Sequence, residues 1–208
     1  MLSNRERLRR LIEERCLISG PEFTLTTGEK SRFYFDCKAI TLCGEGLSLI
    51  AEELLREIEK LPDTPTAIGG LTMGADFMTA GVIMLSHQVG GPVRDGSIVR
   101  KEPKKHGTQN RIENELPRGT KIVVVDDVIT TGASTIKACE EFERAGYEVV
   151  GILAIVDREA GGRQRLEDRY KHVTTLFTKS DFPTLIEPTT SEGTDRATAR
   201  LPDKAVLP

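Results

Sequence analysis

The sequence predicts a doubly wound α/β fold, in which helices cover both faces of a parallel β-sheet, and three observations support this prediction. Short apolar runs typical of buried strands alternate with segments of helical periodicity over most of the chain. One run, at 121–125, leads directly into two acids and a Thr/Gly-rich turn, and parallel sheets bind ligands beyond such strand ends. The length of 208 residues suits one α/β domain with modest additions.

The N-terminal segment predicts a helix followed by two short strands. Ser3 to Glu6 has the form of a capping box, and apolar side chains follow at helical spacing until Gly20-Pro21 ends the pattern. Residues 23–25 and 31–36 are typical of strands on either side of a Thr-Gly-Glu turn. We expect the segment from about 1 to 40 to form a small hood over the carboxyl edge of the sheet.

An amphipathic helix is predicted at 44–60, where a periodic apolar stripe stops at Leu61-Pro62. The later elements are expected in this order: a strand at 66–70, a helix at about 74–87, strands at 97–101 and 121–125, a helix at 133–145, a strand at 148–157, a short helix at 164–170 and a strand at 173–178. Residues 102–119 are polar and lack periodicity. Because Thr, Ser, Pro and charged residues dominate the C-terminus, we expect one domain over 1–187 and a flexible tail over 188–208.

The overall composition argues against several classes of protein. The formal net charge is −3, so no global basic field points to nucleic acid. No apolar run is long enough for a membrane span, and the N-terminus lacks the apolar core of a secretory signal. The four cysteines form no close C-x-x-C pair, so we expect reduced thiols in a cytoplasmic protein, without a metal bound to them.

One contiguous motif carries the strongest indication of chemistry. It consists of Val123-Val124-Val125-Asp126-Asp127-Val128-Ile129-Thr130-Thr131-Gly132-Ala133-Ser134. The Thr/Gly/Ser turn offers backbone N–H groups and hydroxyls at a helix N-terminus, which suit a phosphate. The two carboxylates before it suit vicinal sugar hydroxyls, or a divalent metal held with them. The alternative is an ordinary strand–turn–helix junction, but the order of strand, acid pair and phosphate turn favours a site for a ribose 5-phosphate.

Three further patches are expected at the same edge of the sheet. Residues 100–111 hold five cationic side chains and one acid, which suits a mobile lid over negatively charged oxygens, although such a run is also typical of a solvated loop. The glycine-bearing loop at 69–76 would let the backbone approach a phosphate group closely, or would simply turn the strand into a helix. Arg158 follows a late strand, and its planar guanidinium suits a carboxylate or heterocycle carbonyls, with a surface ion pair as the alternative.

These segments resemble the orotate phosphoribosyltransferases, a family of type I phosphoribosyltransferases. The acid-pair motif is similar to the family's 5-phosphoribosyl-1-pyrophosphate (PRPP) motif. The resemblance extends to Phe23–Phe35, to the Arg-Lys-x-x-Lys-x-His-Gly run from Arg100, and to Val156-Asp157-Arg158. It covers residues 20–180, approximately, in matching order, and implies the type I phosphoribosyltransferase fold.

The resemblance implies a role for each matching position. Asp126, Asp127, Lys104 and His106 would be catalytic, the acids holding the ribose hydroxyls and His106 acting as a proton donor or a further cation. PRPP would be bound by Arg100, Lys101, Lys104, His106, Thr72, Met73, Asp126, Asp127, Val128, Ile129, Thr130, Thr131, Gly132, Ala133 and Ser134. Orotate would be bound by Tyr34, Phe35, Thr130 and Arg158. Mg²⁺ would be held mainly by PRPP, near Asp126 and Asp127, and lid residues would be shared across a homodimer.

Two departures from the family pattern are relevant to PRPP binding. Many relatives have lysine at the positions of Thr26 and Met73, and Lys30 or Lys105 would have to substitute for them. Two rival functions are a type I phosphoribosyltransferase for another base and a PRPP-sensing regulator without turnover. The first would not need the 23–35 signature, and the second would carry a basic face or an added DNA-binding segment.

Overall fold

The structure is a computed structural model that describes residues 2–24, 30–102 and 111–182, with the backbone alone at 18–24 and 30–34. The predicted tail and most of the cationic run at 100–111 therefore lie outside the described residues. Among the described residues, no helix combines the length and the apolar character that crossing a membrane requires.

A six-stranded sheet forms the centre of the molecule, in the order β5-β4-β3-β6-β7-β8. Neighbouring strands are parallel except β4 and β5, which are antiparallel. The strands are β3 (Ala67–Leu71), β4 (Asp95–Val99), β5 (Ile112–Glu113), β6 (Lys121–Ile129), β7 (Glu148–Asp157) and β8 (Val173–Thr178).

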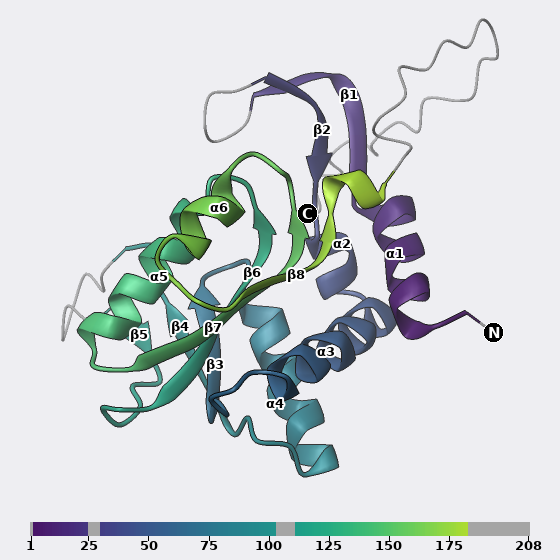
Figure 1. Cartoon of the computed structure of the whole chain (residues 1–208). Coiled ribbons are helices and arrows are strands. Elements are labelled where there is room, and N and C mark those ends of the chain that lie inside the picture. The colour runs from purple at the N-terminus through teal and green to yellow at the C-terminus, as the bar shows by residue number, and fades with distance from the viewer. Residues whose placement is uncertain (1, 25–29, 103–110, 183–208) are drawn as a thin grey trace, which may run out of the picture.

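Helices cover both faces of this sheet (Figure 1). One face carries α1 (Asn4–Arg15), α3 (Gly44–Glu59) and α4 (Asp76–Val89), and the other carries α5 (Ala133–Arg144) and α6 (Gly162–Glu167). The alternation of side chains along β6 explains the two cores, since Val123 and Val125 join the first and Ile122 and Val124 the second. The predicted doubly wound α/β architecture is confirmed.

The N-terminal region contains a separate two-stranded sheet. Strands β1 (Leu17–Thr24) and β2 (Lys30–Phe35) pair in antiparallel fashion and stand apart from the main sheet in Figure 1. Helix α1 ends at Arg15, earlier than the predicted limit at Gly20, because Leu17 pairs with Phe35 and the carbonyl of Cys16 accepts from the Asp36 amide at 2.9 Å. Helix α1 packs on α3 and also contacts β1, and Phe35 of β2 belongs to the same core cluster.

Several element boundaries differ from the predictions. Strand β6 was expected to end at Val125 but continues through both acids to Ile129, because β7 keeps pairing alongside it. Strand β4 begins at Asp95 rather than Ser97, since its backbone pairs with β3. Helix α2 (Lys38–Thr41), strand β5 and a terminal 3₁₀ turn, η1 (Lys179–Asp181), were not predicted, as all three are too short to show a hydrophobic period.

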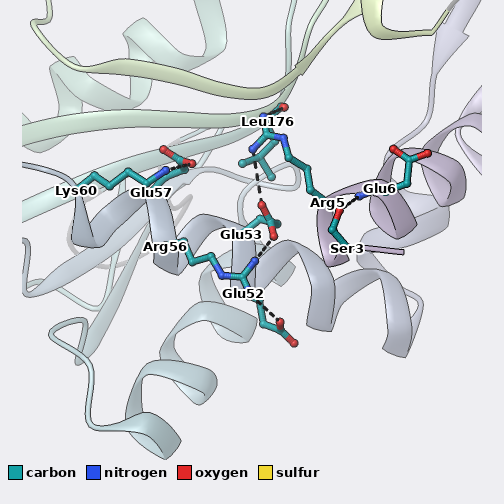
Figure 2. Close-up of polar contacts among 9 residues, drawn as sticks. All are labelled: Ser3, Arg5, Glu6, Glu52, Glu53, Arg56, Glu57, Lys60 and Leu176. Carbon is teal, nitrogen blue, oxygen red and sulfur yellow. Dashed lines mark hydrogen bonds and ion pairs between the residues drawn. The ribbon is translucent and has the colours of Figure 1, made fainter. Parts of the chain in front are cut away.

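A network of charged side chains connects helices α1 and α3 with strand β8 (Figure 2). Arg5 of α1 donates to the Leu176 carbonyl in β8 and lies 3.7 Å from the Glu53 carboxylate of α3. Arg56 also pairs with Glu53, whose side chain is only 6% exposed. The guanidinium of Arg5 stacks 5.2 Å from the Phe177 ring centre, so one side chain joins the first helix to the last strand.

Candidate active site

A cavity of about 410 Å³ lies where β3, β4 and β6 end. Its lining combines the acid pair, the loop after β3, one residue of helix α2 and Lys101, which belongs to the cationic run that follows β4. The lining residues are Lys38, Leu71, Thr72, Met73, Gly74, Lys101, Asp126, Asp127, Val128 and Ser134. The fold therefore brings together seven of the residues predicted for PRPP: Thr72, Met73, Lys101, Asp126, Asp127, Val128 and Ser134.

Asp126 is nearly buried and is bonded mainly within its own motif. Its Oδ2 atom accepts from the hydroxyls of Ser134 and Thr135, both at 2.7 Å, and its Oδ1 atom accepts from the Asp127 amide at 3.1 Å. Burial, together with the neighbouring Asp127 charge, raises the pKa of Asp126 to about 6, against the lowering effect of the two hydroxyls. Asp126 thus fixes the first turn of α5 to the end of β6.

Asp127 is less buried and contacts the opposite wall of the cavity. Its Oδ1 atom accepts from the Val128 amide at 2.9 Å. A Cβ atom added at Gly74 would lie 2.9 Å from Oδ1 of Asp127 and 3.1 Å from Oδ1 of Asp126. Because real Cβ atoms do not approach oxygen this closely, any larger residue at position 74 would require the Asp127 carboxylate or the loop after β3 to shift.

The turn between β6 and α5 is shaped for an anion. Gly132 has a φ of +74°, which suits glycine, and it precedes a 12-residue helix whose first amides have no partner within the helix. The Gly162 amide donates to the Thr130 carbonyl at 3.1 Å, so the start of α6 supports the turn. Backbone N–H groups at such an N-terminus favour a phosphate.

A second cavity of about 610 Å³ adjoins the first, and Thr72 and Lys101 line both. Arg100 lines only the second cavity, where it donates to the Glu113 carboxylate at 2.8 Å. The hydroxyl of Thr72 donates to Asp76 at 2.9 Å, which fixes the loop after β3 to the start of α4. The two cations predicted at the end of β4 therefore face neighbouring spaces, with Lys101 nearer the acid pair.

The two ends of the predicted lid are joined at their base. The Arg100 amide donates to the Arg111 carbonyl at 2.7 Å, and the Lys101 carbonyl accepts from Arg111 at 3.3 Å. Lys137 of α5 donates to the same Lys101 carbonyl at 3.0 Å. Lys104 and His106 lie outside the described residues, so their predicted roles remain proposals.

The residues predicted for orotate lie in different surroundings. Phe35 is 5% exposed and packs edge-on against Phe182 at 5.7 Å, which places its ring in the core. Arg158 follows β7, and its amide donates to the Ile129 carbonyl at 2.9 Å, beside the end of β6. The side chain of Tyr34 is outside the described set.

Among the motif residues predicted for PRPP, Ile129 is 1% exposed, so only its backbone could serve a ligand. Thr130, Thr131, Gly132 and Ala133 form the turn itself, and they do not line either cavity. Their contribution to an anion site would come from the geometry of the turn.

Lys38 lines the acid-pair cavity and was missed from the sequence. Lys38 stands two residues after the strand predicted at 31–36. Its position near a strand end was the one feature of the sequence that could have indicated a ligand contact. Nothing in that local pattern indicated that α2 would carry it to the cavity that the acids of β6 also line.

The donor set of the cavity suits a divalent cation held chiefly by a ligand. In the part of the chain that the structure describes, no group of three or more His, Cys, Asp or Glu side chains is placed to hold a metal. The two acids supply carboxylate oxygens, which Mg²⁺ prefers, and substrate or water oxygens would have to complete an octahedral shell.

Comparison with known proteins places this architecture in a family. Residues 45–191 match the family model described as phosphoribosyl transferase domain. The orotate phosphoribosyltransferase of Aquifex aeolicus is 39% identical over 184 residues, which are 88% of this chain and 99% of that protein. That of Leptospira biflexa is 44% identical over 165 residues, covering 79% and 89% respectively. The Mycobacterium tuberculosis orotate phosphoribosyltransferase in complex with PRPP has a TM-score of 0.69 at 25% identity, over 86% of this chain and 99% of that one.

Proposed function

Because this chain belongs to the orotate phosphoribosyltransferases, within the phosphoribosyltransferase family, we propose that the acid-pair cavity is its active site. The reaction transfers ribose 5-phosphate from PRPP to N1 of orotate, giving orotidine 5′-monophosphate and pyrophosphate. The observation that carries the assignment of the site is the meeting of three parts in one place: the acid pair, the α5 N-terminal turn and the glycine loop after β3.

Each part of the cavity has a proposed task in binding PRPP. The turn from Thr130 to Ser134 takes the 5-phosphate, in keeping with its amides at a helix N-terminus. Asp127 accepts from the ribose hydroxyls, since it is the less buried acid, while Asp126 mainly holds the turn in place. Thr72 and Met73, with Lys101 and Arg100, surround the pyrophosphate.

The chemical step needs positioning and charge stabilisation more than a nucleophilic side chain. The orotate N1 lone pair forms a bond to C1 while the C1–oxygen bond breaks and its electron pair leaves with pyrophosphate. The proton of N1 is released to a pyrophosphate oxygen or to water. The acid pair near C1 favours positive charge developing on the ribose. Lys104 and His106 would stabilise the departing oxygens, His106 as an acid or a cation, and Arg158, Thr130 and Tyr34 would position orotate. Phe35 supports this region from the core.

Mg²⁺ is the proposed cofactor, held chiefly by PRPP oxygens beside Asp126 and Asp127. When bound, it neutralises negative charge on the pyrophosphate group. The donor set of the cavity supports this proposal because the two carboxylates supply part of an oxygen shell.

A homodimer with shared lid residues is the proposed assembly. Exposed apolar side chains on α4 support it: Met84 is 60% and Val89 62% exposed. Mixing Lys104→Ala with Asp127→Ala subunits should restore part of the lost activity, because one of the two site types in a mixed dimer would be intact. Absence of any recovery in verified mixed dimers would contradict lid sharing.

A cytoplasmic location is also proposed. All four cysteines, Cys16, Cys37, Cys43 and Cys139, are free thiols, which suits a reducing compartment.

The proposed function is tested by ultraviolet measurement of orotate loss with PRPP and Mg²⁺, with uracil, hypoxanthine and adenine in parallel. We expect rapid turnover with orotate alone and its loss on chelation. Turnover with another base would overturn the base assignment and keep the PRPP site. Binding of PRPP without turnover of any base would instead identify a sensor.

A further inference from the structure

Lys38 is a cation that reaches the acid-pair cavity from the N-terminal region. Its Nζ atom lies 2.9 Å from Oδ1 of Asp36, and its backbone amide donates to the same oxygen at 3.2 Å. Its side chain is 42% exposed, and it lines the cavity with Met73 and Asp127. Lys38 therefore combines a fixed partner with access to the space between the acids and the loop after β3.

The backbone around Lys38 is anchored on both sides. Phe35, Cys37 and Ile40 are 5%, 0% and 0% exposed, and the Asp36 amide donates to the Cys16 carbonyl at 2.9 Å. A surface lysine on an unanchored loop would lose much side-chain and backbone entropy when it gripped a ligand. Lys38 starts from a fixed base, so an ionic contact from this position loses less of its free energy to ordering.

The charges around the cavity indicate what Lys38 would bind. Among the described residues, the ionisable side chains that line the cavity are two acids, Asp126 and Asp127, and two cations, Lys38 and Lys101. The loop from Thr72 to Gly74 contributes no charge, and Met73 is 56% exposed there. A polyanion entering beside two carboxylates needs compensating cations, and an ammonium group, with three N–H donors, can bond to Asp36 and a phosphate oxygen together.

We propose that Lys38 binds the pyrophosphate group of PRPP across from the uncharged loop at Met73, and that Asp36 acts as the positioning residue that orients its ammonium group. The inference rests on the proposed function, since it assigns a substrate contact within the same cavity. In this proposal, Lys38 adds a cation from the N-terminal region to Arg100 and Lys101, the two cations that follow β4.

The test compares Lys38→Gln, Lys38→Arg and the double variant Lys38→Gln/Met73→Lys with the wild type. Lys60→Gln is the matched control, because Lys60 is an exposed lysine that pairs with Glu57 outside the cavity. Measurements are KM for PRPP, KM for orotate, the inhibition constant of pyrophosphate, and the thermal unfolding midpoint.

Loss of one charged contact should raise KM for PRPP and the pyrophosphate inhibition constant about tenfold in Lys38→Gln. KM for orotate and the unfolding midpoint should stay close to wild type. Lys38→Arg should keep most of the affinity, and a lysine at position 73 should restore much of it, since both positions line one cavity. Lys60→Gln should match the wild type.

Equal PRPP and pyrophosphate constants in Lys38→Gln and the wild type would overturn the inference, as would a rise confined to KM for orotate. A loss of kcat with a lowered unfolding midpoint and unchanged PRPP affinity would show a purely structural Asp36–Lys38 pair. Calorimetric binding of PRPP with Mg²⁺ separates this inference from the proposed function. A wild type that binds PRPP but does not consume orotate would refute the function, and the same titration of Lys38→Gln would still test Lys38.

Discussion

Asp126 and Asp127 are adjacent in sequence, yet their carboxylates have different surroundings. Asp126 is 6% exposed and accepts two hydroxyl bonds from the first turn of α5, whereas Asp127 lies nearer the ligand side of the cavity. The strand alternation along β6 produces this division, since successive side chains point to opposite faces. We therefore propose that Asp126 mainly holds the first turn of α5 in place and that Asp127 mainly contacts the substrate.

The raised pKa of Asp126 gives a prediction for stability. Its pKa is about 6 in the folded protein, above the usual 3.8, so the folded state holds the proton more tightly than the unfolded chain. Stability should fall as pH rises through this interval and then level off. In Asp126→Asn that fall should be absent, so the variant gains about 2 kcal/mol relative to wild type between about pH 4 and about pH 8.

Urea unfolding without ligands measures this difference. Asp63→Asn is the control, because its exposed carboxylate pairs with Lys121 and has a lowered pKa. Its stability relative to wild type should fall slightly with rising pH, the opposite sign. Parallel pH curves for wild type and Asp126→Asn would show that Asp126 has no raised pKa.

At this scale the sequence predicted residues within one contiguous motif far better than residues brought together by the fold. Asp126, Asp127 and Ser134 could be found because strand, acids and turn follow each other directly. Lys38 could not be found in this way, because its place in the cavity depends on how the fold brings a four-residue helix to the same space as a strand almost ninety residues later. The burial of Phe35 likewise depends on Phe182, which is distant in sequence.

The loop between β3 and α4 sets how closely two structural elements approach at the site. Gly74→Ala should displace the carboxylates, since the added Cβ would lie 2.9 Å from Asp127. Steady-state kinetics should show kcat/KM for PRPP reduced at least tenfold, equivalent to about 1.4 kcal/mol of transition-state stabilisation. The free energy of unfolding should change much less, because the loop lies at the ligand cavity.

Gly44→Ala provides the matched control for Gly74→Ala. Gly44 begins α3, and a Cβ there would have no atom within 4 Å. Its kinetics should equal those of the wild type. If Gly74→Ala were equally active, the contact between the glycine loop and the acid pair would have no role in catalysis.

Helices and strands with a clear apolar pattern in the sequence were predicted well. Strand segments that exist only through hydrogen-bonded pairing with a neighbouring strand were not. Strands β7 and β8 have the predicted bounds, because continuous or β-branched apolar runs mark both. Strand β5 has two residues and exists through its pairing with β4, which no local pattern reveals. The continuation of β6 past its acids depends in the same way on pairing with β7.

At the scale of the whole molecule, one arginine of α1 connects this helix with α3 and with β8. Arg5 joins α1 to Glu53 of α3 and to β8 through Leu176 (Figure 2). Arg5→Met should lower the free energy of unfolding by about 1–3 kcal/mol, because the nearly buried Glu53 keeps Arg56 but loses one of its two cations.

Urea denaturation tests this contribution, with Arg10→Met as its control. Arg10 lies on the same helix, is 54% exposed and pairs with Glu6 at 3.6 Å, so its loss should be nearly neutral. Equal stability of the two variants would mean that the contacts of Arg5 with Glu53 and Leu176 do not stabilise the fold.

The layered architecture was predictable as a whole, because alternating strand and helix patterns leave few arrangements that bury both faces of a sheet. The packing of α1 on α3 could not be predicted, because the capping box and the apolar spacing define a helix without specifying its neighbour. The ion pair of Arg5 with Glu53 could not be predicted either, because it depends on how these two helices pack.

The central claim is that orotate transfer takes place at the acid pair, and the rate of orotate consumption by Asp127→Asn tests it most directly. With saturating PRPP, orotate and Mg²⁺, the account predicts kcat at least about a hundredfold below wild type, with an unchanged unfolding midpoint. A variant that consumes orotate at the wild-type rate would contradict the account and place the reaction elsewhere in the molecule.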